Sequence, residues 1–113
     1  MDRKGSLIIS GGLNIFPNEV EQVLYQYPGV IEAAVFGVPD EQWGEAVQAI
    51  IALKPGINVT EREIIAFCQD KLARYKIPKS VEFQESLPKS DTGKILTKEL
   101  REPYWKGREK RIN

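Results

Sequence analysis

Apolar positions follow two different spacings along the chain, and each change of spacing marks the border of a short element. Residues 6–9 and 13–16 are brief apolar runs on either side of Ser-Gly-Gly at residues 10–12, which predicts a β-hairpin or a glycine loop flanked by strands. After Pro17, which suits the first position of a helix, apolar residues recur at helical spacing as far as Pro-Gly at residues 28–29. The first part of the chain therefore predicts two strands followed by a helix.

The middle of the chain contains two longer apolar runs. Residues 30–38 and 46–53 predict buried strands that could pair antiparallel across the loop at residues 40–44. Thr60 and Glu63 then form the T-x-x-E pattern of a capping box, and the apolar residues after them are spaced as on one face of a helix. A hairpin of strands followed by a second helix is predicted here.

The last part of the chain is more polar. Residues 80–83 predict a short strand, residues 87–94 a loop and residues 95–100 a last short helix. We take residues 1–101 as one domain and residues 102–113 as a basic, solvated and partly disordered tail. The order β-β-α-β-β-α-β-α predicts an α+β fold with a small, mostly antiparallel sheet. About three core strands and an N-terminal hairpin would form it, with the helices on one side.

Composition excludes several classes of function. The 113 residues suit one compact domain, and 16 basic against 16 acidic residues give no reason to expect nucleic acid as a partner. Cys68 is the single cysteine and there is no histidine, so zinc fingers and His-based catalytic triads are excluded, and no metal site is expected. The start of the chain lacks a long apolar run, so we expect no signal peptide, no membrane span and a cytoplasmic location.

Three features are candidates for chemistry, and each also has an ordinary structural explanation. The glycines of residues 10–12 allow another group to approach the backbone closely, but they also suit a simple turn. Trp43 lies in a predicted loop and either covers the core or faces a ligand. Lys94 follows Gly93 at the end of a polar loop, where most lysines are merely solvated. These residues alone indicate only a globular α+β domain.

Taken together, three segments resemble motifs of the adenylate-forming superfamily, which includes acyl-CoA synthetases, peptide-synthetase adenylation domains and luciferases. Asp-Arg at residues 2–3 and Ser-Gly-Gly-Leu-Asn-Ile-Phe-Pro-Asn-Glu-Val-Glu at residues 10–21 resemble the crossover motif between its two domains. Val-Phe-Gly-Val-Pro-Asp-Glu at residues 35–41, followed by Trp-Gly-Glu, is similar to a block of its fatty-acid and aryl-acid CoA ligases. Leu-Pro-Lys-Ser-Asp-Thr-Gly-Lys-Ile at residues 87–95 resembles its C-terminal lysine motif. The order and separation of the three make the resemblance specific, and it covers residues 2–101.

The resemblance implies an activity and a role for this domain. Family members use ATP to convert a carboxylate into an acyl-adenylate and then transfer the acyl group to a thiol, while a C-terminal lid domain changes its pose between the two steps. Lys94 matches the adenylation lysine, whose ammonium offsets the repulsion between carboxylate and phosphate. Arg3 matches an arginine beside the nucleotide. Gly5 falls at the hinge, where most relatives carry Asp or Lys, so any contact of a charged side chain is lost there.

The resemblance also implies a surface for coenzyme A. The glycine loop matches the wall of the tunnel for the pantetheine arm, Trp43 matches an aromatic residue near the cofactor, and a later segment matches residues at its nucleotide end. The implied CoA-binding residues are Ser10, Gly11, Gly12, Trp43, Tyr75, Lys76 and Lys79.

What this chain lacks defines its expected partners. The phosphate-binding loop, the acyl pocket and the adenine site belong to the family's N-terminal adenylation domain, which we therefore expect as the partner. ATP with Mg²⁺, coenzyme A and a carboxylic acid would be co-substrates of the whole enzyme, with none bound tightly here, and the isolated chain should be inactive. A free-standing docking or CoA-binding module, and the lid of a carrier-protein-directed adenylation domain, are the alternatives. Trp43 and Gly44 favour CoA over a carrier protein.

Overall fold

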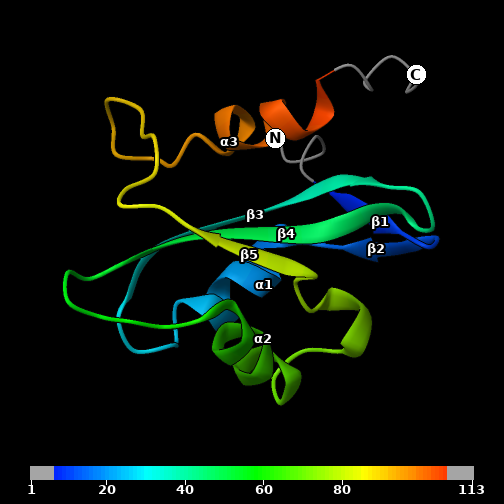
Figure 1. The fold of residues 1–113 in the computed structure, drawn as a ribbon. Helices are drawn as coiled ribbons and strands as arrows, with labels where there is room; N and C mark the ends of the chain where they lie inside the picture. Colours follow the sequence, from blue (N-terminus) through cyan, green and yellow to red (C-terminus); the bar gives the residue numbers. More distant parts are fainter. Residues whose placement is uncertain (1–6, 107–113) are drawn as a thin grey trace.

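A computed structural model describes residues 7–106 and places their elements in the predicted order (Figure 1). A 3-10 helix, η2, precedes the last strand. The elements are β1 (Ile8–Ser10), β2 (Leu13–Ile15), α1 (Pro17–Leu24), β3 (Val30–Asp40), β4 (Gly44–Leu53), α2 (Glu61–Gln69), η2 (Arg74–Lys76), β5 (Ser80–Phe83) and α3 (Thr97–Trp105). The α+β class is therefore confirmed.

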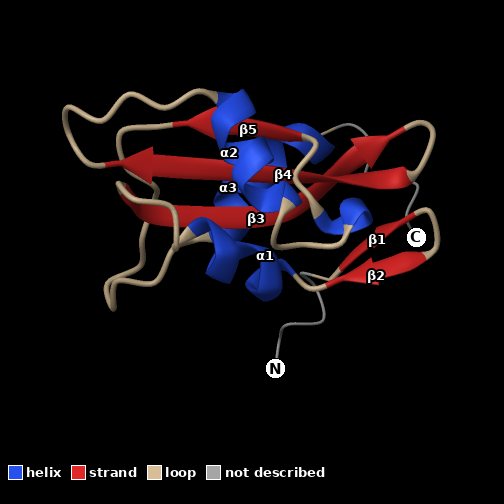
Figure 2. Cartoon of the chain, turned by 90° about the horizontal axis from the view of Figure 1, so that it is seen from below, coloured by secondary structure: helices blue, strands red, loops and turns tan. Residues whose placement is uncertain are grey.

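The strands form two sheets (Figure 2). One is the hairpin of β1 and β2, and the other has the order β3-β4-β5. Strands β3 and β4 pair antiparallel along nearly their whole length, from Val30 opposite Leu53 to Asp40 opposite Gly44. Strand β5 pairs parallel to β4. After β4 the chain returns through α2 to the end of the sheet at which β4 begins, so β5 runs in the same direction as β4. The expectation of a mostly antiparallel sheet is confirmed.

The larger sheet is covered on both faces, so the expectation that all helices pack on one side was wrong for α3. Helices α1 and α2 lie against one face and α3 lies against the other (Figure 1). The physical reason is in the strands: residues 33–37 of β3 and residues 46–52 of β4 are buried consecutively, so both faces need cover. The core beneath α3 contains Ala34, Phe36, Ile50, Ala52, Leu87 and Leu100.

Local signals explain how the elements begin. The capping box is present: Thr60 Oγ1 accepts a hydrogen bond from the Glu63 N–H at 3.1 Å, and Glu63 Oε1 accepts one from the Thr60 N–H at 2.9 Å. Gly11 and Gly12 form the two-residue turn between β1 and β2 with φ of +59° and +85°. A hairpin turn with positive φ at both positions matches the right-handed twist of its strands, which accounts for the pair of glycines.

Helix α3 differs from the sequence prediction at both ends. It starts at Thr97, two residues later than expected, and continues to Trp105, past the expected domain border at residue 101. Two aromatic side chains hold this extension on the sheet. The Tyr104 ring lies 5.5 Å from the Phe36 ring, and Trp105 Nε1 donates a hydrogen bond to the Gly37 carbonyl at 2.8 Å. Residues 102–105 therefore belong to the folded domain; residues 107–113 lie outside the described part.

The outer edges of the sheet are bonded to helix side chains. On β3, the Val35 N–H donates to Glu21 Oε2 of α1 at 2.9 Å. On β5, the Val81 N–H donates to Glu61 Oε2 of α2 at 2.8 Å. These bonds satisfy backbone groups that no neighbouring strand reaches, and they fix the helices against the sheet.

Candidate functional site

Lys94 lies on a tight loop that leads from β5 to α3. Backbone hydrogen bonds close the loop across its width: the Leu96 N–H donates to the Pro88 carbonyl at 2.8 Å, and the Ser90 N–H donates to the Lys94 carbonyl at 2.9 Å. At the tip, the Gly93 N–H donates to the Ser90 carbonyl at 2.9 Å. The loop is therefore a compact turn whose backbone position is defined up to the lysine.

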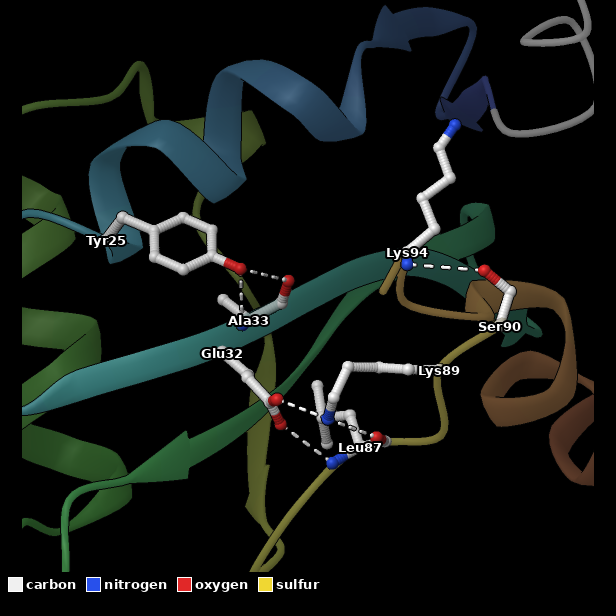
Figure 3. Close-up of polar contacts among 7 residues, drawn as sticks. All are labelled: Tyr25, Glu32, Ala33, Leu87, Lys89, Ser90 and Lys94. Carbon is white, nitrogen blue, oxygen red and sulfur yellow. Dashed lines mark hydrogen bonds and ion pairs between the residues drawn. The ribbon is translucent and has the colours of Figure 1, made fainter. Parts of the chain in front are cut away.

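The Lys94 side chain is exposed and extends away from Ser90 (Figure 3). It lines a shallow recess of about 1100 Å³ together with Phe16, Pro17, Tyr25 and Ile95. Within residues 7–106 its ammonium group has no ion pair or hydrogen bond. An ammonium in this position can contact an anion brought by another molecule without first breaking an internal bond.

Two carboxylates line the same recess as Lys94, and both have other partners. Glu21 accepts the Val35 N–H of β3. Glu19 forms an ion pair with Lys76, whose Nζ lies 2.9 Å from Glu19 Oε1. That hydrogen bond raises the pKa of Lys76 above its ordinary value. Because both carboxylates are engaged, Lys94 is the charged group of the recess that remains open to a ligand.

A second hollow of about 560 Å³ gathers most of the residues expected to bind coenzyme A. Ser10, Gly11, Trp43, Tyr75 and Lys79 all line it, although they come from three distant segments of the chain. We call it the tryptophan groove. No residue lining the groove also lines the recess of Lys94, so the two hollows are separate surfaces of the described domain.

Trp43 is held in this groove by its backbone and by its contact with the glycine turn. The Gly11 N–H donates to the Trp43 carbonyl at 2.8 Å, and a Cβ atom at Gly11 would lie only 2.8 Å from Trp43 Cε3. Asp40 Oδ1 accepts the Trp43 N–H at 3.0 Å, and Asp40 Oδ2 lies 3.1 Å from Lys79 Nζ. The bond from Trp43, followed by that from Lys79, lowers the pKa of Asp40. This carboxylate thus holds two groove residues at once.

Other expected site residues lie elsewhere. Lys76 turns toward Glu19 on α1, and Gly12 does not line the groove. Arg3 and Gly5 fall outside the described residues. Two further residues were not predicted as part of the site: Arg74, which lines the groove, and Asp40, which organises it. Asp40 begins a turn and could have been found from the tendency of Asp to accept N–H groups two or three residues on. Arg74 carries no comparable signal.

Residues 7–106 include no group of three or more His, Cys, Asp or Glu side chains arranged to hold a metal ion. In the same range, no helix is long and apolar enough to cross a membrane.

Comparison with known proteins finds chains similar to this one in a single group of enzymes. The family model described as the AMP-binding enzyme C-terminal domain matches residues 19–94. A 2-succinylbenzoate–CoA ligase of Bacillus mycoides is 52% identical over 101 residues, which are 89% of this chain and 21% of that protein. A long-chain-fatty-acid–CoA ligase of Mycobacterium tuberculosis is 50% identical over 103 residues, which are 91% of this chain and 20% of that protein.

Solved structures give the same result. A fatty acyl CoA synthetase of Mycobacterium tuberculosis superposes with a TM-score of 0.84 at 50% identity, covering 91% of this chain and 20% of that one. The o-succinylbenzoate CoA synthetase of Bacillus subtilis, solved with its acyl-adenylate intermediate, superposes with a TM-score of 0.81 at 41% identity, covering 88% and 20%. The chain thus spans about a fifth of the length of these relatives.

Proposed function

Because this chain belongs to the AMP-binding enzyme C-terminal domains, we propose that it is the lid domain of an acyl-CoA or aryl-CoA ligase. In this proposal Lys94 serves the adenylation of a carboxylate by ATP, and the tryptophan groove forms one wall of the path for coenzyme A. An N-terminal adenylation domain supplies the rest of the active site. The observation that carries the proposal is the Lys94 ammonium, unpaired among the described residues, on a loop closed by backbone bonds and on a surface separate from the groove.

The proposed role of Lys94 follows from the charges in the first half-reaction. A carboxylate oxygen attacks the α-phosphorus of ATP, the bond to pyrophosphate breaks, and an acyl-adenylate forms. Both reactants are anionic, and negative charge accumulates on the phosphoryl oxygens as they approach. An ammonium held beside these oxygens offsets the repulsion and stabilises the transition state. Lysine suits the task because it is a compact charge on a long stem.

The proposed role of the tryptophan groove belongs to the second half-reaction, in which the thiolate attacks the acyl carbonyl and AMP leaves. Gly11 has no side chain to block a thin pantetheine arm, and Trp43 offers an apolar surface that is 48% exposed. Lys79 and Arg74 add positive charge suited to the phosphates of CoA. Since the groove and the recess share no residue, the lid would have to present each surface in turn to the same active site.

A chimeric enzyme tests the role of Lys94. In the Mycobacterium tuberculosis fatty acyl CoA synthetase, the aligned fifth is replaced by this chain; we call the product the lid chimera. Lys94→Ala should slow carboxylate-dependent ATP–pyrophosphate exchange by about 100-fold or more, since a transition-state charge contact is lost. Thioester formation from pre-made acyl-adenylate and CoA should keep its rate, because that step uses the other surface.

Lys98→Ala is the matched control, because Lys98 is also exposed and lies only four residues later in the chain, in the first turn of α3. Exchange that is equal in the Lys94→Ala and Lys98→Ala chimeras would remove Lys94 from the chemistry. The isolated chain should show no exchange, because it brings neither an ATP site nor an acyl pocket. Robust exchange by the isolated chain would contradict the lid assignment.

A further inference from the structure

Glu32 of β3 connects the sheet to the base of the Lys94 loop. Its Oε1 accepts the Leu87 N–H at 2.9 Å, and its Oε2 forms an ion pair with Lys89 Nζ (Figure 3). Lys89 Nζ also donates to the Leu87 carbonyl at 2.9 Å. The Glu32 side chain is only 18% exposed. One carboxylate therefore bonds two residues that lie 55 and 57 positions later in the chain.

Few residues separate the contact of Glu32 with Lys89 from Lys94. Lys89 forms an isolated antiparallel bridge with Ile95, the residue directly after Lys94. On the other side, Leu87 is 2% exposed and packs into the core beneath α3, so this end of the loop is fixed. Between the fixed end and the bridge, Glu32 is the side chain that bonds the loop to the sheet. A shift of Lys89 would move Ile95 and, with it, the backbone of Lys94.

We propose that Glu32 is a positioning residue for the adenylation half-reaction: by holding Leu87 and Lys89, it sets where the Lys94 ammonium is presented. The inference rests on the proposed role of Lys94. Glu32 itself touches no substrate, since its carboxylate is occupied by the two loop residues. Its effect is on geometry, and placing a reacting charge out of position by about 1 Å can slow a reaction by about 100-fold.

The charge of Glu32 supports this role at neutral pH. The hydrogen bond from Lys89, followed by that from the Leu87 N–H, lowers the pKa of Glu32 below its ordinary value of 4.5. The carboxylate therefore stays ionised under working conditions, and the charge-assisted bond to Lys89 persists.

The experiment compares variants of the lid chimera in the two half-reactions. Glu32→Gln keeps the size and one acceptor oxygen but loses the charge that binds Lys89. We expect exchange to fall by about tenfold or more, with thioester formation from pre-made acyl-adenylate unchanged. Lys89→Met should give a similar loss of exchange. The double variant should be no worse than either single variant, because all three proteins lack the same ion pair between Glu32 and Lys89. Glu85→Gln, an exposed glutamate two residues before Leu87, is the matched control.

The outcomes separate this inference from the proposed function. If Lys94→Ala abolishes exchange while Glu32→Gln and Lys89→Met match the control, Lys94 is confirmed in its role and Glu32 does not position it. Equal losses in both half-reactions would mean that Glu32 only supports the fold, which also overturns the inference. If Lys94→Ala leaves exchange intact, both proposals fail together. Should Glu32→Gln not fold, Lys89→Met decides, since Lys89 is the more exposed partner at 36%.

Discussion

At the turn between β1 and β2, two neighbouring glycines have positive φ but different surroundings. Gly11 faces Trp43, whereas a Cβ atom at Gly12 would meet nothing within 4 Å. Gly12→Ala should therefore lose only the backbone preference, about 1–2 kcal/mol of unfolding free energy. Gly11→Ala has the same backbone cost and also forces the Trp43 ring away. We expect a larger loss of stability, together with a change in tryptophan fluorescence that Gly12→Ala does not produce.

The same two substitutions, Gly11→Ala and Gly12→Ala, also test the tryptophan groove. In the lid chimera, Gly11→Ala should raise the KM for CoA in thioester formation and leave ATP–pyrophosphate exchange unchanged. Gly12→Ala provides the control, because Gly12 does not line the groove. A normal KM for CoA after Gly11→Ala would indicate that this wall does not contact the cofactor.

The sequence suggested individual candidate residues, but it did not indicate how they are arranged. Lys94, Trp43 and the glycine turn could be proposed from the sequence because each belongs to a motif of consecutive residues, and their roles stay predictions. Asp40 has a local signal in the turn that follows it, but its bond to Lys79 depends on a partner far away in the chain. Glu32 was missed because its partners at Leu87 and Lys89 are equally distant. Only the folded sheet brings such partners together, and no local spacing indicates them.

The capping box at the start of helix α2 leads to a direct prediction about stability. Thr60→Ala removes the hydroxyl that accepts the Glu63 N–H and leaves that donor without its cap. Unfolding free energy should fall by about 1 kcal/mol, measured by denaturant titration. Thr60→Ser retains the hydroxyl and should stay close to the original chain. Equal stability of all three proteins would mean that tertiary packing alone determines where this helix begins.

Elements were predictable where a local motif or a continuous apolar run marks them, and less so where distant contacts decide their extent. The capping box indicated α2, and the apolar runs indicated β3 and β4. The extension of α3 was not predicted, because Pro103 lies inside it and the last part of the chain is rich in charged residues. The helix persists there because Tyr104 and Trp105 find partners on the sheet. These contacts, like the covering of the second sheet face, depend on the tertiary fold.

The partly buried carboxylate of Glu45 should contribute to the pH dependence of the stability of the domain. Burial raises the pKa of Glu45 above its ordinary value of 4.5, although the Ile9 N–H and the charge of Arg101 act in the opposite direction. When the folded-state pKa is the higher one, the folded state binds the proton more tightly, so stability falls as pH rises through that pKa. At pH 7 the ionised Glu45 is therefore a net cost.

Glu45→Gln should remove this cost while keeping an oxygen for the Ile9 N–H. We expect the melting temperature at pH 7 to rise by about 2–4 °C and the difference to shrink as the pH approaches 4, because the Glu45 carboxyl takes up a proton over this range and becomes neutral like the glutamine. Thermal unfolding at several pH values, with Glu85→Gln as the exposed control, measures this. If the Glu45→Gln variant melts lower than the original chain at pH 7, the charge of Glu45 is stabilising and the prediction is wrong.

Side chains from α1 and α2, and from Tyr25 directly after α1, accept hydrogen bonds from backbone N–H groups on both edge strands of the three-stranded sheet. Besides the bonds from Glu21 and Glu61, the Tyr25 hydroxyl accepts the Ala33 N–H at 3.0 Å (Figure 3). An open strand edge is a template on which another polypeptide can add a strand, and this is a common route to aggregation. Here an incoming strand would first have to displace side chains that are anchored in α1 and α2. If the chain acts as the proposed lid, it can therefore expose the edges of its sheet during a change of pose without recruiting foreign strands.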